Sequence, residues 1–325
     1  MQAIVYRTYG SPDVVRCEEI EKPTPGEAQV LIKVRAASVN PLDWHFMRGL
    51  PYPVRLMTGL GKPKIIGLGV DVAGDVEAVG KNVTRFKPGD PVFGSCRGAF
   101  AEYTCTAESG LVLKPDNITF EQAAAVPVAA FTALQSLRDK ANLQPGQKVL
   151  INGAAGGVGT FAVQIAKSFG AHVTGVCSTR NVDLVRSLGA DEVIDYTQQD
   201  FTKNGQRYDV FLDLMANHSL SESRRVLKSQ ATYVAAGGSA GNWMIGTIGR
   251  GLGALVLSQF SGKKHASILA KSSRDDLAVM ADLMQTGKVT PVIDKCYQLR
   301  ETADAIRYLE QGHARGKVII TVSEN

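Results

Sequence analysis

The sequence predicts an α/β protein built from two domains, an antiparallel β domain and a doubly wound parallel sheet. The first roughly 120 residues read as short apolar strands punctuated by turns such as TPGE and FKPGD. From about Val126, short strands alternate with amphipathic helices, a rhythm typical of a parallel sheet. The length of 325 residues also favours two domains, because a single core stops growing near ~250–300 residues.

The β domain is predicted from its strand candidates, which are AIVYR, VLIKVRAASV, VAGDVEAVG, DPVFG, FAEYTCT and LVLKP. The pattern is lost between Pro41 and Pro63, where aromatic residues and prolines gather. We predict a long loop there, and long loops in compact domains are frequently functional.

The parallel sheet is predicted from strands and helices that alternate along the chain. The strand KVLIN (148–152) precedes apolar residues at helical spacing, which are Val158, Ala162, Ile165, Ala166 and Phe169. The strand HVTGV (172–176) follows, and after a second helix come EVIDY, DVFLDL and TYVAAG. The order β-α-β-α-β indicates a doubly wound sheet.

The composition argues against a nucleic-acid-binding protein and against a membrane-spanning one. The net charge of +5 is spread without long runs, which favours a small anionic ligand over a nucleic acid. Five cysteines without a C-x-x-C motif indicate reduced thiols, so we expect a cytoplasmic protein, or an organelle stroma if a transit peptide has been removed. Residues 251–260 form the most apolar late stretch, but Gly and Ser interrupt it, and we expect no membrane span.

A glycine-rich turn, GAAGGVG (153–159), stands between the first parallel strand and its helix. Gly156 lets the backbone approach a pyrophosphate, Gly159 permits close packing of helix on strand, and the helix N-terminus attracts anions. A strict G-x-G-x-x-G motif would have glycine where Ala154 stands. The turn therefore predicts a dinucleotide site, with a turn that binds no ligand as the alternative.

The second parallel strand ends where NAD-binding chains often carry an acid for the ribose 2′-hydroxyl. Here the next residues are Ser178, Thr179 and Arg180, two hydroxyl donors and a guanidinium that suit a 2′-phosphate. We therefore predict NADP(H) as the cofactor. The alternative is that Arg180 only caps a solvated turn.

Six motifs, taken in order, resemble the medium-chain dehydrogenase/reductase superfamily. They are GVDVAGDVEAVG (69–80), FKPGDPVFG (86–94), AFAEY (99–103), VLINGAAGGVG (149–159), CSTRNVDLVRSLGADEVIDY (177–196) and GHARGKVIITV (312–322). The last two resemble most the zinc-independent quinone oxidoreductase branch, which includes plastid-type homologues that reduce enals and enones. The resemblance implies a GroES-like barrel in residues 1–125, completed by 270–325, and a Rossmann domain in 126–269.

The resemblance also implies which residues contact the cofactor. These are Gly156, Gly157, Val158, Ser178, Thr179, Arg180, Tyr196, Ala236, Gly237 and Lys317. In the alternative interpretation, Tyr196 is only the aromatic residue at a strand end and does not contact the cofactor. Fold analogy further implies a homodimer.

The same family contains zinc alcohol dehydrogenases, and this chain departs from them where they bind metal. Asn40 stands where those enzymes keep a cysteine ligand, and Val70 stands where they keep a histidine. Valine cannot ligate a metal and the five histidines show no ligand spacing, so we expect no metal site. Asn40 and Tyr52 are the candidate catalytic residues, although Asn40 could be only the turn residue before Pro41.

These features predict an NADPH-dependent oxidoreductase that transfers hydride to a quinone or to the C=C bond of an α,β-unsaturated carbonyl. Without a Lewis acid, a conjugated acceptor is the easier substrate, because its charge spreads into an enolate or hydroquinone anion. Two alternatives stay open, a non-catalytic NADPH-binding protein with a regulatory or structural role and an enoyl-thioester reductase.

Overall fold

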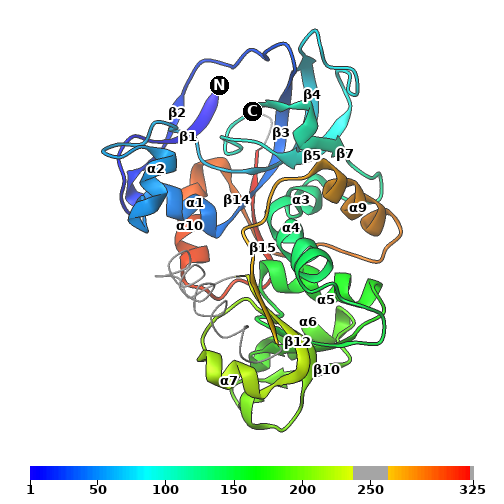
Figure 1. Cartoon of the computed structure of the whole chain (residues 1–325). Coiled ribbons are helices and arrows are strands. Elements are labelled where there is room, and N and C mark those ends of the chain that lie inside the picture. The colour runs from blue at the N-terminus through cyan, green and yellow to red at the C-terminus, as the bar shows by residue number, and fades with distance from the viewer. Residues whose placement is uncertain (237–262, 323–325) are drawn as a thin grey trace. The chain divides into compact units, whose positions relative to one another are not determined.

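The computed structural model describes residues 1–236 and 263–322. The contacts between residues divide the chain into two compact units (Figure 1). The first unit consists of Met1–Val128, Ser272–Gly287 and Pro291–Asn325, and the second of Ala129–Lys271 and Lys288–Thr290. The carboxyl-terminal part of the chain thus returns to the unit in which the chain begins.

The first unit is built on two β-sheets. A seven-stranded sheet has the order β14-β15-β3-β4-β5-β7, and β6 pairs with β3. Its strands are β3 (Gln29–Val39), β4 (Asp71–Val79), β5 (Pro91–Ser95), β6 (Tyr103–Ala107), β7 (Leu111–Leu113), β14 (Ile293–Gln298) and β15 (Lys317–Thr321). A small antiparallel pair consists of β1 (Gln2–Tyr6) and β2 (Val15–Glu19). The alternating hydrophobic strands of the first 120 residues are therefore confirmed as a mainly antiparallel β domain.

The long loop predicted between Pro41 and Pro63 is wrong in its first half, because a helix begins at Pro41. This helix, α1 (Pro41–Arg48), has Asn40 as its N-cap and Pro41 at its first position, where a missing N–H costs nothing. A 3₁₀ turn (Tyr52–Val54) and the short helix α2 (Arg55–Thr58) follow. The remaining helices of this unit are α3 (Phe120–Ala124), α9 (Arg274–Gln285) and α10 (Thr302–Glu310).

The second unit contains a six-stranded parallel sheet with the order β10-β9-β8-β11-β12-β13. Its strands are β8 (Lys148–Asn152), β9 (His172–Cys177), β10 (Glu192–Asp195), β11 (Tyr208–Asp213), β12 (Leu227–Ala235) and β13 (Lys264–Ser267). Helix α5 (Gly157–Ser168) lies between β8 and β9, α6 (Val182–Ser187) between β9 and β10, and α7 (Leu220–Arg225) between β11 and β12, while α4 (Pro127–Gln135) leads into this unit. The predicted doubly wound sheet is confirmed, and its order reverses between β8 and β11, where α/β proteins bind ligands.

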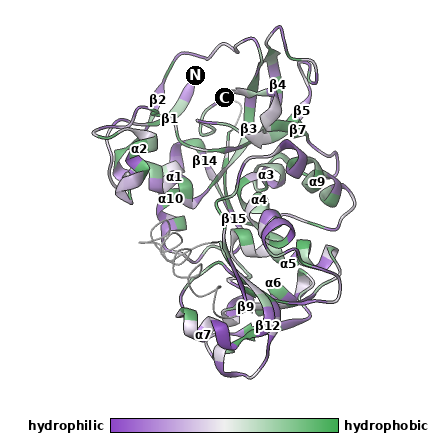
Figure 2. Ribbon diagram, in the orientation of Figure 1, coloured by the Kyte–Doolittle hydropathy of each residue, from purple (hydrophilic) through white to green (hydrophobic). Residues whose placement is uncertain are grey.

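The apolar residues of the strands form the cores of the two units. Val149, Leu150 and Ile151 of β8 are completely buried, whereas helices such as α5 and α9 carry both hydrophobic and hydrophilic residues (Figure 2). Among residues 1–236 and 263–322, none of the helices combines the length and apolar content needed to cross a bilayer. Residues 251–260, discussed above as the most apolar late stretch, lie outside the described residues.

Candidate functional site

The glycine turn joins β8 to α5 in the second unit. β8 ends at Asn152, Gly153 adopts a φ of +90°, and α5 begins at Gly157 with Gly156 as its N-cap. The first N–H groups of an α-helix have no partner within the helix. The twelve-residue helix α5 therefore presents free donors and the positive end of its dipole at Gly157 and Val158.

Glycine is present at positions 159 and 156 of this turn for different reasons. A Cβ added at Gly159 would lie 2.1 Å from the carbonyl oxygen of Gly153, so only glycine fits where helix and strand cross. A Cβ added at Gly156 would meet only that same oxygen, at 3.5 Å, which is an ordinary contact. The protein itself does not require glycine at position 156, and the free space there suits a phosphate group that approaches the backbone.

The segment after β9 provides the groups predicted for a 2′-phosphate. Ser178 follows the strand directly, and Thr179 and Arg180 begin a 3₁₀ turn with both residues exposed. The neighbouring strand β10 pairs in register, Asp195 opposite Cys177, and the N–H of Tyr196 donates to the carbonyl of Cys177 at 3.0 Å. The side chain of Tyr196 is 58% exposed, so the predicted phosphate contacts lie at the ends of two adjacent strands.

The two hydroxyl groups of this turn are bonded differently. Thr179 donates to the carboxylate of Asp195 at 2.6 Å, and this bond is the main reason why the pKa of Asp195 lies below its ordinary value. Ser178 Oγ accepts a hydrogen bond from the amide of Asn181 at 3.2 Å, which leaves the Ser178 proton for another acceptor. Of the two predicted donors, Ser178 is therefore the available one.

Asp195 was not singled out in the sequence. Its carboxylate also accepts from the N–H and the hydroxyl of Thr197, at 2.9 and 2.8 Å, and from the amide of Gln198 at 3.0 Å. Asp195 thus ties the turn at Thr179 to the turn that carries Tyr196. Its place at the end of the predicted strand EVIDY was the only signal that the sequence offered.

Ala236 follows β12 at the carboxyl edge of the parallel sheet, and its N–H donates to the carbonyl of Asp213 at 3.0 Å. The buried carboxylate of Asp213 accepts from the amide of Asn152 at 3.0 Å and from the hydroxyl of Tyr233 at 2.8 Å. Asp213 therefore joins the ends of three neighbouring strands on which the candidate site is built. Gly237, predicted as a cofactor contact, lies outside the described residues.

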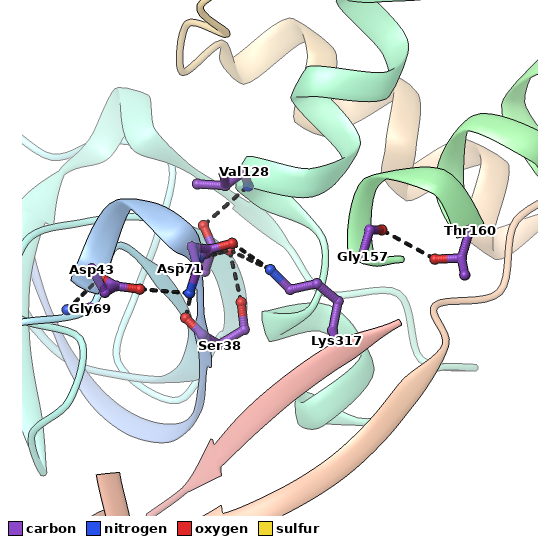
Figure 3. Close-up of polar contacts among 9 residues, drawn as sticks. Ser38, Asp43, Gly69, Asp71, Val128, Gly157, Thr160 and Lys317 are labelled. Carbon is purple, nitrogen blue, oxygen red and sulfur yellow. Dashed lines mark hydrogen bonds and ion pairs between the residues drawn. The ribbon is translucent and has the colours of Figure 1, made fainter. Parts of the chain in front are cut away.

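A buried polar cluster in the first unit contains two of the predicted site residues, Asn40 and Lys317. The antiparallel register of β15 and β3, with Val318 opposite Val39, brings them together although 277 positions separate them. Lys317 Nζ donates to Asn40 Oδ1 at 2.5 Å. It also lies 3.6 Å from a carboxylate oxygen of Asp71 (Figure 3).

Asp71 is the acceptor at the centre of this cluster. Its carboxylate accepts from the hydroxyl of Ser38 at 2.8 Å and from the N–H of Val128 at 3.1 Å (Figure 3). It also accepts from the amide of Asn40 at 2.9 Å. The side chain of Asn40, which is 1% exposed, is thus bonded to protein groups through both its oxygen and its nitrogen.

Asp43 belongs to the same cluster and caps helix α1. Its two carboxylate oxygens accept from the N–H of Asn40 at 2.7 Å and from the N–H of Gly69 at 3.1 Å. Burial raises the pKa of Asp43 to about 7, while these N–H groups and Lys317 oppose the shift. Burial also raises the pKa of Asp71 and lowers that of Lys317, because each charge has left water.

Tyr52, the second candidate catalytic residue, does not belong to this cluster. It lies in the 3₁₀ turn before α2, is 70% exposed, and carries the guanidinium of Arg55 at 5.0 Å from its ring centre. In the part of the chain that the structure describes, no group of three or more His, Cys, Asp or Glu side chains could hold a metal ion.

Two protein families match this chain. The family described as "Alcohol dehydrogenase GroES-like domain" matches residues 26–116, and the family described as "Zinc-binding dehydrogenase" matches residues 188–320. The first match lies within the predicted GroES-like domain, and the second spans the later part of the predicted Rossmann domain and most of the carboxyl-terminal return.

Relatives with curated names cover nearly the whole chain. The "Chloroplast envelope quinone oxidoreductase homolog" of Arabidopsis thaliana is 33% identical over 341 residues, 98% of this chain and 98% of the relative. The "NADPH-dependent alkenal/one oxidoreductase, chloroplastic" of the same plant is 35% identical over 98% of this chain and 79% of its own length. The solved structure of the quinone oxidoreductase from Coxiella burnetii superimposes with a TM-score of 0.86 at 31% identity, and covers 99% of both chains.

Proposed function

The chain belongs to the quinone oxidoreductase branch of the medium-chain dehydrogenase/reductase superfamily, and on that premise we propose that it uses NADPH to reduce a quinone or the C=C bond of an α,β-unsaturated carbonyl. The use of a nicotinamide dinucleotide follows from the family. The choice of NADPH over NADH is our proposal. The observation that carries it is the turn after β9, where Ser178 and Arg180 stand in place of an acid.

The residues of the second unit fit the cofactor. The free N–H groups at the start of α5 and the open space at Gly156 suit the pyrophosphate. The Ser178 hydroxyl has a proton to donate, and the guanidinium of Arg180 suits a 2′-phosphate, with Tyr196 on the adjacent strand end. In this arrangement Thr179 supports the turn through Asp195, and Ser178 and Arg180 make the phosphate contacts.

The reaction class follows from the residues that replace the metal ligands of the zinc enzymes. When bound, NADPH supplies a hydride to an electrophilic carbon. Asn40 and Val70 provide no metal ligand set, so the chain itself must stabilise the developing negative charge through hydrogen-bond donors. A quinone or an enone suits such a site, because its charge spreads over a conjugated system that water can protonate.

We propose that Asn40 acts on the reaction chiefly as a positioning residue. Its amide joins the ammonium of Lys317 to the carboxylate of Asp71, and its N–H fixes Asp43 at the start of α1. A direct catalytic contact of Asn40 or Tyr52 with the substrate stays a prediction. The variants Asn40→Ala and Tyr52→Phe test it, since a catalytic group lowers kcat whereas a binding group raises KM.

The decisive experiment is a paired titration of the protein with NADPH and NADH, followed by turnover with a quinone, a short enone and an enoyl thioester. Arg180→Glu should weaken NADPH binding by roughly a hundredfold or more and NADH binding far less. Arg186→Glu, at an exposed arginine on the following helix, is the matched control. Equal losses for both cofactors would remove Arg180 from the phosphate site.

Turnover separates the remaining functions. Activity with the quinone or the enone that survives treatment with EDTA is the expected result. Preference for the enoyl thioester would identify the protein as an enoyl-thioester reductase. Tight NADPH binding with no oxidation across the whole panel would contradict the enzymatic proposal and favour a regulatory or structural protein.

We also propose a homodimer in the cytoplasm. The homodimer rests on analogy with the fold, and the cytoplasmic location on five cysteines that occur as free thiols in the structure. Sedimentation equilibrium and microscopy of the tagged full chain test these two proposals.

A further inference from the structure

The segment after α1 presents an unusual set of apolar side chains to solvent. Five large hydrophobic residues between positions 50 and 60 are exposed by 41–77%. We call them the 50–60 patch, which consists of Leu50, Tyr52, Leu56, Met57 and Leu60. Half of the exposed large hydrophobic residues described for the chain fall within these eleven positions, and clustered exposure of this kind marks an interaction surface.

The patch is held in place by its buried face. Val54 and Thr58, which are 2% and 4% exposed, point inward from the same two turns. The hydroxyl of Tyr9 bonds to the Thr58 hydroxyl at 2.8 Å and donates to the carbonyl of Gly59 at 2.5 Å. The guanidinium of Arg55 donates to the carbonyl of Gly49 at 3.0 Å. The apolar side chains therefore face outward because an ordered scaffold holds them there.

The charged residues of the segment that carries the patch have one sign. The 27 residues from Trp44 to Val70 contain no Asp or Glu. Lys62 and Lys64 follow the patch directly, both are exposed, and neither forms an ion pair within the described part of the chain. The partner that this surface fits is consequently apolar inside and negatively charged outside.

We propose that the 50–60 patch, with Lys62 and Lys64, docks the protein on the surface of an anionic phospholipid bilayer. Leucine and methionine side chains on a single helical turn can enter the region just below the headgroups, and a tyrosine ring suits the headgroup level. The two lysines then lie among the anionic headgroups. The protein remains peripheral, as a short apolar segment of this kind cannot span the bilayer.

The size of the patch favours a bilayer over a protein partner. A stable protein–protein interface involves roughly 20–30 residues on each side, with a shape that matches the partner. Five side chains on and beside two short helical turns fall well below that number. A lipid surface requires no complementary shape, and its affinity grows with apolar area and with each basic residue.

The test is co-sedimentation of the full chain with vesicles of phosphatidylcholine, with and without phosphatidylglycerol. We expect binding to the anionic vesicles only, weakened by added salt. Lys62→Glu combined with Lys64→Glu should lower the partition coefficient by about thirtyfold or more, since each basic residue near the surface contributes about a factor of five. A triple variant, Leu56→Ser, Met57→Ser and Leu60→Ser, should lower it by more than about tenfold.

The controls are matched in exposure and lie elsewhere in the first unit. Leu113→Ser replaces a leucine that is 54% exposed, and Lys81→Glu replaces a lysine whose side chain is 69% exposed. Both should bind vesicles like the wild type. All positions are exposed, so unchanged circular dichroism is expected for every variant.

Three outcomes would overturn the proposal. The first is a wild type that stays in the supernatant with anionic vesicles. The second is a triple serine variant that binds as well as the wild type, because charge alone would then explain the binding. The third is concentration-dependent self-association of the wild type that the triple variant abolishes, which would assign the patch to a second copy of this chain.

Discussion

Replacement of Lys317 by Met tests whether the buried polar cluster holds the first unit together. The aliphatic stem is kept by this change, and only the ammonium is removed. The Lys317 side chain is 4% exposed and that of Asp71 is 0% exposed, so the change leaves a buried carboxylate without its countercharge. Loss of one partner of such a pair costs about 3–5 kcal/mol. Three neutral donors still reach Asp71, so we expect the lower end, about 3 kcal/mol.

The assay is urea denaturation of the protein without cofactor, followed by tryptophan fluorescence. In a Trp243→Phe background, Trp44 is the sole tryptophan. It is 8% exposed in α1 and reports on the first unit. The combination with Asp71→Asn removes both charges and should recover at least about 1 kcal/mol relative to the sum of the single variants.

The pH dependence gives a second readout of the same substitution. The pKa of Asp71 is already raised by burial, and it rises further when the ammonium is absent. The loss of stability in Lys317→Met should therefore be complete where Asp71 is ionised and shrink as the pH falls through that raised pKa. A loss below about 1 kcal/mol at neutral pH, or strict additivity with Asp71→Asn, would refute the reasoning.

Three further predictions concern Asp43, the two turn glycines and Thr179. The pKa of Asp43 is about 7 in the folded protein and about 3.9 in the unfolded chain. Because the folded state holds the proton more tightly, Asp43 contributes fully to the free energy of unfolding below about pH 4. This contribution decreases by up to about 4 kcal/mol as the pH rises to about 7. The difference in unfolding free energy between the wild type and Asp43→Asn, measured in urea, should fall over this interval, and a rise would contradict the shift. Gly159→Ala should prevent folding or cost more than about 3 kcal/mol, whereas Gly156→Ala should melt like the wild type by calorimetry and lose NADPH affinity by about tenfold or more. Thr179→Val should weaken NADPH binding roughly fivefold in calorimetric titrations, because the hydroxyl bond to Asp195 holds the turn. Thr179→Ser should restore the affinity. Equal affinities for the wild type and both variants would show that the bond has no such role.

Local patterns in the sequence were sufficient for the strands and the glycine turn. Strand β8 coincides with the predicted KVLIN because a run of buried β-branched and aliphatic residues between polar neighbours has few other solutions. The close packing expected at Gly159 is present for the same reason, as it depends on the adjacent strand and helix alone. Helix α1 was missed although Asn40, Pro41 and Asp43 form a helix-start signal, because eight residues rich in aromatic side chains show weak periodicity.

Contacts between distant positions had to come from the tertiary structure. Ser178 and Thr179 look alike in the sequence, and only the register of two parallel strands, which places Asp195 beside Thr179, shows which hydroxyl is committed. In the same way Lys317 reads as a basic residue before a strand, and the antiparallel pairing of β15 with β3 buries it against Asn40. The sequence by itself determined the fold class, the family and the glycine turn between β8 and α5, since these depend on periodicity and on neighbouring residues. The hydrogen-bond partner of each polar side chain depends on strand register across up to 277 positions, which only the folded chain decides.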